Sequence, residues 1–152
     1  MESFKLDRNL AHLAILQRIE LTTPFQKRTR KLFGRYLFSK IFSKYMLDLD
    51  RISKDYYKIM YHEFLTIKKF INSNQNILSI GAGIGGLEAI INNSFEDEKF
   101  TFIERDFVSK KIRYGWDNEN SEAYNKLYLL RNFLLLNRVR SDKFTIVNFD
   151  KK

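Results

Sequence analysis

The 152-residue chain contains no cysteine, so disulfides and thiolate metal sites are excluded. It has only two histidines, His12 and His62, and their distance along the chain argues against a histidine-based metal site. No long apolar run is present either. Charged residues interrupt the apolar positions of the N-terminus, so neither a signal peptide nor a transmembrane segment is expected. These absences predict a cytoplasmic protein without a bound metal ion.

The formal net charge is +9, and most of it lies in the first half of the chain. Residues 1–70 contain 15 Lys or Arg against 7 Asp or Glu, whereas residues 71–152 contain 12 against 11. The basic segment 27–44 also carries several aromatic residues, and two interpretations are open. One is a site for phosphates, nucleic acid, an anionic membrane surface or an anionic substrate; the other is a solvated helix face. Because no recognition motif accompanies the charge, we favour the solvated face and expect no specific nucleic-acid binding.

Apolar residues recur at helical spacing throughout the first half. The second of the three predicted helices begins with a capping-box pattern at Thr23 and Gln26, with the only proline at its first position. We therefore expect an N-terminal helical region over residues 1–72. The predicted helices are 4–21, 24–47 and 53–71.

The second half, residues 73–152, alternates short apolar runs with helical patterns. Helical crossovers of this length suit parallel strands, and such crossovers are right-handed. The pattern predicts an α/β fold with a partial parallel sheet of order 3-2-1, whose strand ends open on one edge. The irregular stretch 106–120 is either a binding loop or a surface loop. The predicted strands are 76–80, 100–104 and 144–149, and the predicted helices are 86–92 and 121–137.

A glycine-rich turn directly follows the first of these strands. Gly81, Gly83, Gly85 and Gly86 allow a tight turn and leave room for a ligand to pack on the backbone. Glu104 ends the next strand, where its carboxylate would accept hydrogen bonds from the two hydroxyls of a ribose. The spacing fits both the dinucleotide-binding fingerprint and the first motif of S-adenosylmethionine-dependent methyltransferases. A glycine turn without a ligand is the third interpretation.

Glu88 lies in the first turn of the helix that follows the glycines. A carboxylate there offsets the positive field of the helix N-terminus, which would suit a zwitterionic or cationic ligand better than a pyrophosphate. A solvent-facing Glu88 would weaken this preference.

Residues 57–150 resemble the class I S-adenosylmethionine-dependent methyltransferases. The likeness is carried by residues 77–86 as the glycine motif, by Glu104, and by Asp150 after the third strand. It implies a Rossmann-like three-layer sandwich, S-adenosyl-L-methionine as cofactor, and a small-molecule O- or N-acceptor. In that family the second-strand acid binds the ribose hydroxyls and the third-strand acid meets the adenine amino group. The cofactor-binding residues that the resemblance implies are Ser79, Gly81, Ala82, Gly83, Gly85, Gly86, Glu104, Arg105 and Asp150.

The sequence departs from this family in two places. Ser79 stands where the glycine motif usually has an acid, and the chain looks truncated after the third strand, because the family's later strands do not follow. The first strand would then have an unpaired edge, which is a liability for a parallel sheet. We expect the N-terminal helices, a second copy in a homodimer, or a partner chain to cover that edge.

Two other functions compete with methyl transfer. The glycine motif followed by Glu104 and Arg105 also resembles the N-terminal segment of flavin- or NAD-binding oxidoreductases. Those proteins usually begin near this motif, whereas three predicted helices precede it here. A catalytically inactive half-domain that acts in protein assembly is the non-enzyme alternative. If the protein is a methyltransferase, its substrate is a small molecule that can be anionic, and His62 and Tyr61 are the candidate bases.

Overall fold

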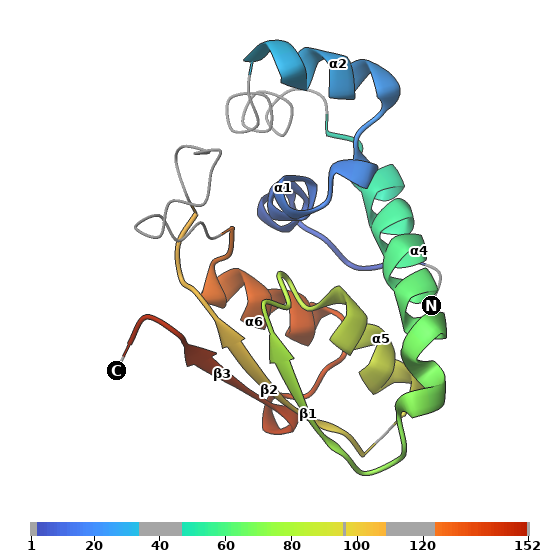
Figure 1. Cartoon of the computed structure of the whole chain (residues 1–152), viewed down its shortest axis with the longest axis vertical. Coiled ribbons are helices and arrows are strands. Elements are labelled where there is room, and N and C mark those ends of the chain that lie inside the picture. Colours follow the sequence, from blue (N-terminus) through green and yellow to red (C-terminus); the bar gives the residue numbers. More distant parts are fainter. Residues whose placement is uncertain (1–2, 34–46, 96, 109–123, 152) are drawn as a thin grey trace.

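The computed structural model describes residues 3–33, 47–95, 97–108 and 124–151 (Figure 1). Most of the basic segment 27–44, the second half of the predicted helix 24–47 and most of the loop 106–120 lie outside the described residues. Short 3-10 turns, η1 (Ile19–Leu21), η2 (Lys68–Phe70) and η3 (Ser141–Lys143), link some of the longer elements. The helices are α1 (Arg8–Gln17), α2 (Pro24–Phe33), α4 (Leu49–Ile67), α5 (Gly86–Ser94) and α6 (Leu127–Leu136), and the strands are β1 (Asn76–Ile80), β2 (Lys99–Glu104) and β3 (Phe144–Asn148).

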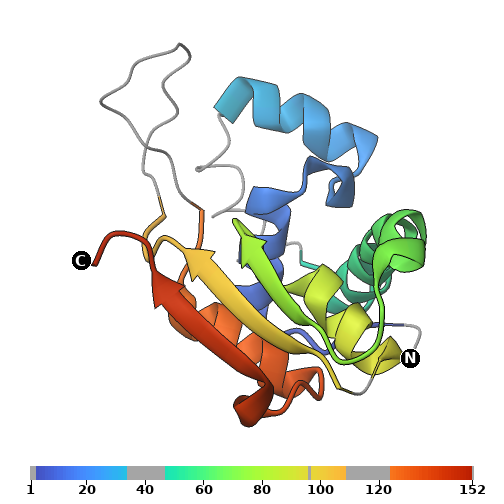
Figure 2. The ribbon, with the colours of Figure 1, turned by 60° about the horizontal axis from the view of Figure 1, so that its bottom comes forward.

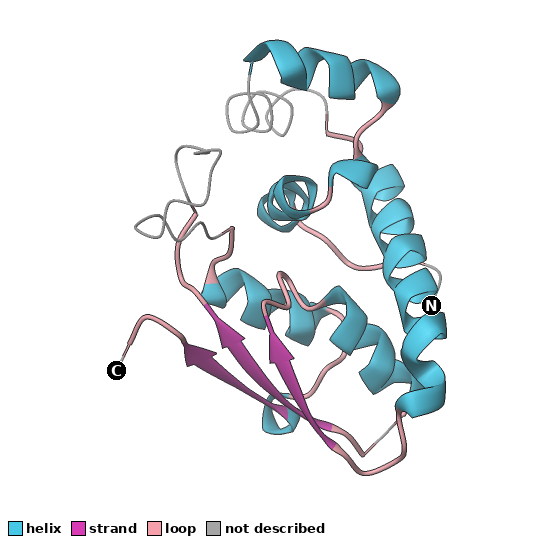
Figure 3. Cartoon of the chain, in the orientation of Figure 1, coloured by secondary structure: helices cyan, strands magenta, loops and turns pink. Residues whose placement is uncertain are grey.

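The three strands form one parallel sheet in the order β1-β2-β3, which confirms the predicted α/β class and strand order. Ile80 at the end of β1 is in register with Ile103 of β2, and Glu104 is in register with Asn148 of β3. The carboxyl ends of all three strands therefore meet at one edge of the sheet (Figure 3).

The described helices cover only one face of this sheet. Figures 1 and 2 show α5 and α6 against the same face, with α1 and α4 packed beyond them. The opposite face presents Leu78, Ile80 and Val147 to solvent. The expected sandwich has helices on both faces of the sheet, and no helix on the second face is found among the described residues. The reason is handedness, because two right-handed crossovers that step in the same direction place both helices on the same side.

Among the described strands, β1 lies at the edge of the sheet and pairs only with β2. The expectation that N-terminal helices cover this edge is wrong for the described ones, since α1 and α4 pack on the helical layer instead (Figure 2). Side chains of β1 stay open to solvent, with Leu78 58% and Ile80 72% exposed. Coverage by a second copy or by a partner chain remains a prediction.

One hydrophobic core joins the N-terminal helices to the sheet. Phe4, which precedes α1, packs against Tyr56 and Tyr57 of α4 and against Phe133 of α6, with ring centroids 5.1–5.3 Å apart. The predicted regions 1–72 and 73–152 therefore share buried side chains. This shared core fixes α1 and α4 relative to the strand ends.

Capping side chains explain where the helices begin. α1 starts at Arg8 rather than at residue 4, because the Asp7 carboxylate accepts from the Leu10 N–H at 2.8 Å. α4 starts at Leu49 rather than at residue 53, because Asp48 caps it in the same way. The capping box of α2 is confirmed: Thr23 and Gln26 exchange side-chain to backbone hydrogen bonds of 2.8 and 3.3 Å.

α4 is the longest described helix, with 19 residues, and charged residues occur along its length. Its buried side chains, among them Ile52, Tyr56, Met60 and Phe64, follow helical spacing and face the core. None of the described helices is both long and apolar enough to cross a membrane.

Asn137 ties the N-terminal segment to the end of α6. Its buried side chain accepts from the Lys5 N–H at 2.9 Å and donates to the Lys5 and Phe133 carbonyls at 3.1 and 2.9 Å. We predict that Asn137→Ala lowers the free energy of unfolding by about 2 kcal/mol, because it removes the side-chain partners of the Lys5 N–H and carbonyl groups. Urea unfolding measures the loss. Asn132→Ala, at an exposed position of the same helix, should cost less than about 0.5 kcal/mol, and equal losses in both variants would contradict the assignment.

Candidate ligand-binding site

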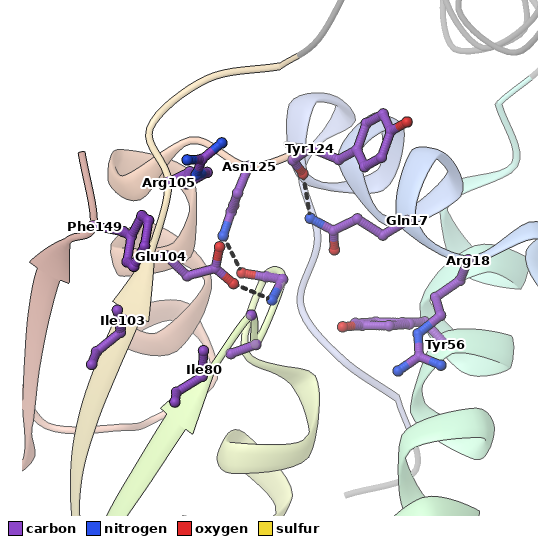
Figure 4. A pocket seen from close by; sticks show the side chains of 13 residues that line it. Gln17, Arg18, Tyr56, Ile80, Ile103, Glu104, Arg105, Tyr124, Asn125 and Phe149 are labelled. Carbon is purple, nitrogen blue, oxygen red and sulfur yellow. Dashed lines mark hydrogen bonds between the residues drawn. The ribbon is translucent and has the colours of Figure 1, made fainter. Parts of the chain in front are cut away.

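A cavity of about 530 Å³ opens at the carboxyl ends of β1 and β2 (Figure 4). Its size falls in the range of small-molecule sites, and its position is the edge where parallel sheets bind ligands. Both the sheet and the N-terminal helices contribute to its walls. The lining residues are Gln17, Arg18, Tyr56, Ile80, Gly81, Ala82, Gly83, Ile103, Glu104, Arg105, Tyr124, Asn125 and Phe149.

The glycine turn forms the floor of the cavity. Gly81, Gly83 and Gly85 all have left-handed backbone conformations, with φ of 70°, 65° and 84°. At Gly81 a Cβ would meet no atom within 4 Å, so the space above this residue is open. A ligand can therefore approach the backbone closely at the point where β1 ends.

Glu104 reaches from the end of β2 to the middle of this turn. Its buried carboxylate accepts from the Gly83 N–H at 2.7 Å, and the Asn125 side-chain amide donates to the Gly83 carbonyl at 2.5 Å. The Gly81 N–H donates to the Ile103 carbonyl at 3.1 Å, which extends the strand pairing into the turn. These bonds hold the turn in one conformation and place a carboxylate on the cavity wall.

One more N–H of the turn is occupied by an acceptor of the chain, since the Gly85 N–H donates to the Ala82 carbonyl at 3.2 Å. The Tyr56 hydroxyl of α4 lies close to the next residue, Gly86. A Cβ at Gly86 would lie only 2.6 Å from that hydroxyl oxygen, so glycine is required for this close approach. The first residue of α5 therefore packs directly against Tyr56 of α4.

Glu88 is buried behind the turn and is not exposed to solvent. Its carboxylate bonds to the Ser79 hydroxyl, and its second oxygen has no partner among the described residues. Burial raises the pKa of Glu88, the Ser79 hydrogen bond opposes this shift, and the nearby charge of Glu104 adds to it. Ser79 therefore contacts Glu88 and does not line the cavity.

The predicted cofactor residues divide into two groups. Gly81, Ala82, Gly83, Glu104 and Arg105 are brought together on the cavity wall. Ser79, Gly85 and Gly86 support the turn from behind and do not line the cavity; a Cβ at Gly85 would lie 2.9 Å from Leu130 of α6.

Asp150 does not line the cavity. It forms an ion pair with Arg105 at 3.2 Å, while the preceding Phe149 lines the cavity in its place. β3 ends at Asn148, and residues 149 and 150 form a turn that directs the two side chains differently. The acid after β3 is thus held by Arg105 at the rim of the site.

The two candidate bases lie away from the cavity. Tyr61 and His62 are exposed on α4, and the Tyr61 ring stacks on Tyr57 with centroids 5.8 Å apart. Tyr56 of α4 points into the cavity. Tyr61 and His62 follow it by five and six positions, so their side chains are rotated about 140° and 240° around the helix axis from that of Tyr56. Neither side chain is a lining residue.

Sequence reasoning missed the wall formed by the N-terminal helices. Gln17 donates to the Tyr124 carbonyl at 2.7 Å, and its amide oxygen lies against Gly83. In the sequence, Gln17 is marked only as a polar residue among the apolar positions of its helix. Tyr56 has the helical spacing of the buried residues on α4, which is typical of an ordinary core position.

Comparisons of the chain with protein-family models, with curated proteins and with solved structures found no match. Within the described ranges, no three acidic or histidine side chains are grouped so that they could hold a metal ion.

The environment of Glu88 predicts a pH dependence of stability. Its folded pKa is raised, so its favourable contribution is complete below the unfolded value and is lost as the pH rises through the folded value. We expect Glu88→Gln to gain stability relative to the wild type as the pH rises above the ordinary pKa of a carboxyl group, because the amide stays neutral. Urea unfolding at several pH values tests this. Glu20→Gln, at an exposed position, should show no such trend, and a pH-independent difference for Glu88→Gln would contradict the assignment.

Proposed function

We propose that the cavity binds S-adenosyl-L-methionine and that the protein is a methyltransferase acting on an O- or N-acceptor of small size. One observation carries the proposal: the carboxylate of Glu104 lies on the cavity wall beside a glycine turn that is open above Gly81. A carboxylate at this place can accept from both hydroxyls of a ribose.

The walls next to Glu104 suit the flat base of a nucleoside. Ile80, Ile103 and Phe149 give that end of the cavity an apolar surface, and Phe149 is 63% exposed, so its ring is available to a ligand. Apolar walls with a few oriented polar groups are typical of cofactor sites. An adenosine moiety would place its base on this surface and its ribose near Glu104.

The hydrogen bonds of the turn disfavour the flavin and NAD alternatives. A dinucleotide places its pyrophosphate on free N–H groups at a glycine turn and helix N-terminus. Here the Gly83 N–H already donates to Glu104, and the buried Glu88 lies in the first turn of the helix that follows. A pyrophosphate would have to displace the Glu104 carboxylate from this N–H and approach two acids. A sulfonium ligand has no phosphate and meets no such conflict.

Methyl transfer needs positioning more than it needs a base. S-adenosyl-L-methionine supplies an activated methyl group, and the protein holds the acceptor in line with it. Burial, reinforced by the charge of Glu88, raises the pKa of Tyr56, so its hydroxyl stays protonated and acts as a donor. The cavity also carries Arg18 and Arg105, which favours an anionic acceptor.

The open face of the sheet favours a second candidate function, assembly with another chain. Leu78, Ile80 and Val147 are exposed on one face of a parallel sheet, and parallel sheets are usually covered on both faces. A second copy or a partner chain would bury this surface and pair with the free edge of β1.

We predict that Glu104→Gln weakens the binding of S-adenosylhomocysteine about 10- to 100-fold, because hydrogen bonds to a charged acceptor are lost. The amide can still accept from Gly83, so the turn should keep its conformation. Calorimetry with S-adenosylhomocysteine, flavin and NAD in parallel measures the effect.

Asp142→Asn is the matched control, since Asp142 lies in η3 at the opposite end of the sheet and pairs with Arg140. Its affinity should equal that of the wild type. Binding of flavin or NAD in place of S-adenosylhomocysteine would contradict the proposed cofactor. An unchanged affinity in Glu104→Gln would contradict the assignment of Glu104 to the ribose.

A further inference from the structure

The positive charge of the chain is concentrated in one segment. Residues 21–47 contain seven Lys or Arg and no Asp or Glu, whereas the rest of the chain contains 20 against 18. Six aromatic residues are interleaved with these bases. The helix α2 (Pro24–Phe33) belongs to this segment and has four bases among its ten residues. None of its described residues lines the cavity, so the proposed cofactor site makes no use of this charge.

α2 lies at one end of the molecule. Figures 1 and 2 show it beyond α1 and α4, on the side toward which the carboxyl ends of the strands point. Gln26 in its first turn is buried, whereas Phe25 beside it is 68% exposed. Neighbouring residues of a helix are rotated about 100° from one another. The side of α2 that carries Phe25 is therefore turned away from the buried side.

The sequence of α2 separates apolar from basic positions around the helix axis. The positions that share one side are Phe25, Thr29, Leu32 and Phe33, and those that share the other are Lys27, Arg28, Arg30 and Lys31. The side chains of Lys27 and Arg28 are exposed. Bases on one side and an aromatic residue on the other are typical of helices that lie in the interface of a membrane.

The exposed aromatic ring favours a lipid surface over a nucleic acid. Nucleic acids bind bases through phosphates, and this attraction does not involve an apolar side of a helix. Phe25 and Lys27 lie on opposite sides of α2, so one occupant has to accept an apolar ring and positive charges together. A bilayer with anionic headgroups does this, because the acyl chains bury the ring and the long basic side chains reach the headgroups.

We propose that α2 docks on a membrane surface that contains anionic lipids, with Phe25 at the level of the acyl chains and with Lys27 and Arg28 at the headgroups. A helix of ten residues is about 15 Å long, half of the hydrocarbon thickness of about 30 Å, so α2 lies along the surface. The proposal is independent of the proposed cofactor. Docking through α2 would hold the strand ends, and with them the cavity, on the membrane side of the protein (Figure 1).

The test is co-sedimentation of the full chain with vesicles made of equal parts of phosphatidylcholine and phosphatidylglycerol. The wild type should bind these vesicles and should not bind vesicles of phosphatidylcholine alone. Raising the salt from about 0.1 M to about 1 M should weaken binding, because the screening length falls from about 10 Å to about 3 Å.

Two variants of α2 separate the charge from the ring. Lys27→Gln/Arg28→Gln should weaken binding about 10- to 30-fold, since each base near an anionic surface contributes about 5-fold. Phe25→Ala should weaken it about 3- to 10-fold, because less apolar surface is buried. Lys27→Arg/Arg28→Lys keeps the charge and should bind like the wild type.

η2 supplies matched controls at the end of α4 that is farther from α2 (Figure 1). Its residues Lys68 and Lys69 are exposed, and Phe70 is 70% exposed, close to the value for Phe25. Lys68→Gln/Lys69→Gln removes the same charge from the chain, and Phe70→Ala removes a ring of equal exposure. Both controls should bind like the wild type, and circular dichroism checks that every variant is folded.

Three outcomes would overturn the proposal and leave the cofactor site standing. The first is that the wild type does not bind the anionic vesicles. The second is an equal loss in the α2 and η2 variants, which would mean that only the net charge matters. The third is binding of an oligonucleotide that Lys27→Gln/Arg28→Gln weakens and Phe25→Ala does not, without binding to vesicles, which would assign α2 to a nucleic acid.

Discussion

The hydrogen bond from the Gly83 N–H to the Glu104 carboxylate is the interaction on which the site depends. It joins the end of β2 to the middle of the glycine turn, 21 residues earlier in the chain. It also decides the chemistry of the cavity, because the N–H that a phosphate would need already has an acceptor. The same carboxylate that holds the turn is the group we assign to the ribose, so structure and binding depend on one side chain.

The order of the strands explains where the described helices lie relative to the sheet. Because β1, β2 and β3 are added in one direction, both right-handed crossovers lie on the same face of the sheet. The helices α1 and α4 then stack on this single helical layer and reach the strand ends from behind it (Figure 1). The cavity thus has a wall from the first part of the chain, and the opposite face of the sheet stays open.

The sequence was most informative where structure is local. The apolar runs, the glycine turn and the spacing to Glu104 specify a strand, a turn and a neighbouring parallel strand, and all three are present. It was least informative where segments far apart meet. The pairing of Arg18 with Glu63 spans 45 residues and follows from core packing that no local pattern records.

The sequence also predicted the positions of some single side chains incorrectly, because these positions depend on contacts between different elements. Asp150 follows the strand as predicted, but the charge of Arg105 holds it outside the cavity, and an ion pair cannot be read from spacing. Ser79 stands where an acid was expected, and an acid is nevertheless present beside it, supplied by Glu88 from the next helix. A linear motif lists residues in chain order, whereas the site draws them from several elements.

Tyr56 links the packing of the N-terminal helices to the glycine turn. Its hydroxyl lies against the first residue of α5, where Gly86 has no Cβ that would block it. Burial raises the pKa of this hydroxyl, so the group keeps its proton beside the turn. The docking of α4 therefore completes the cavity wall with a neutral group that can donate a hydrogen bond. If α4 were displaced, the cavity would lose this wall, and the turn would meet solvent where it now meets a hydroxyl.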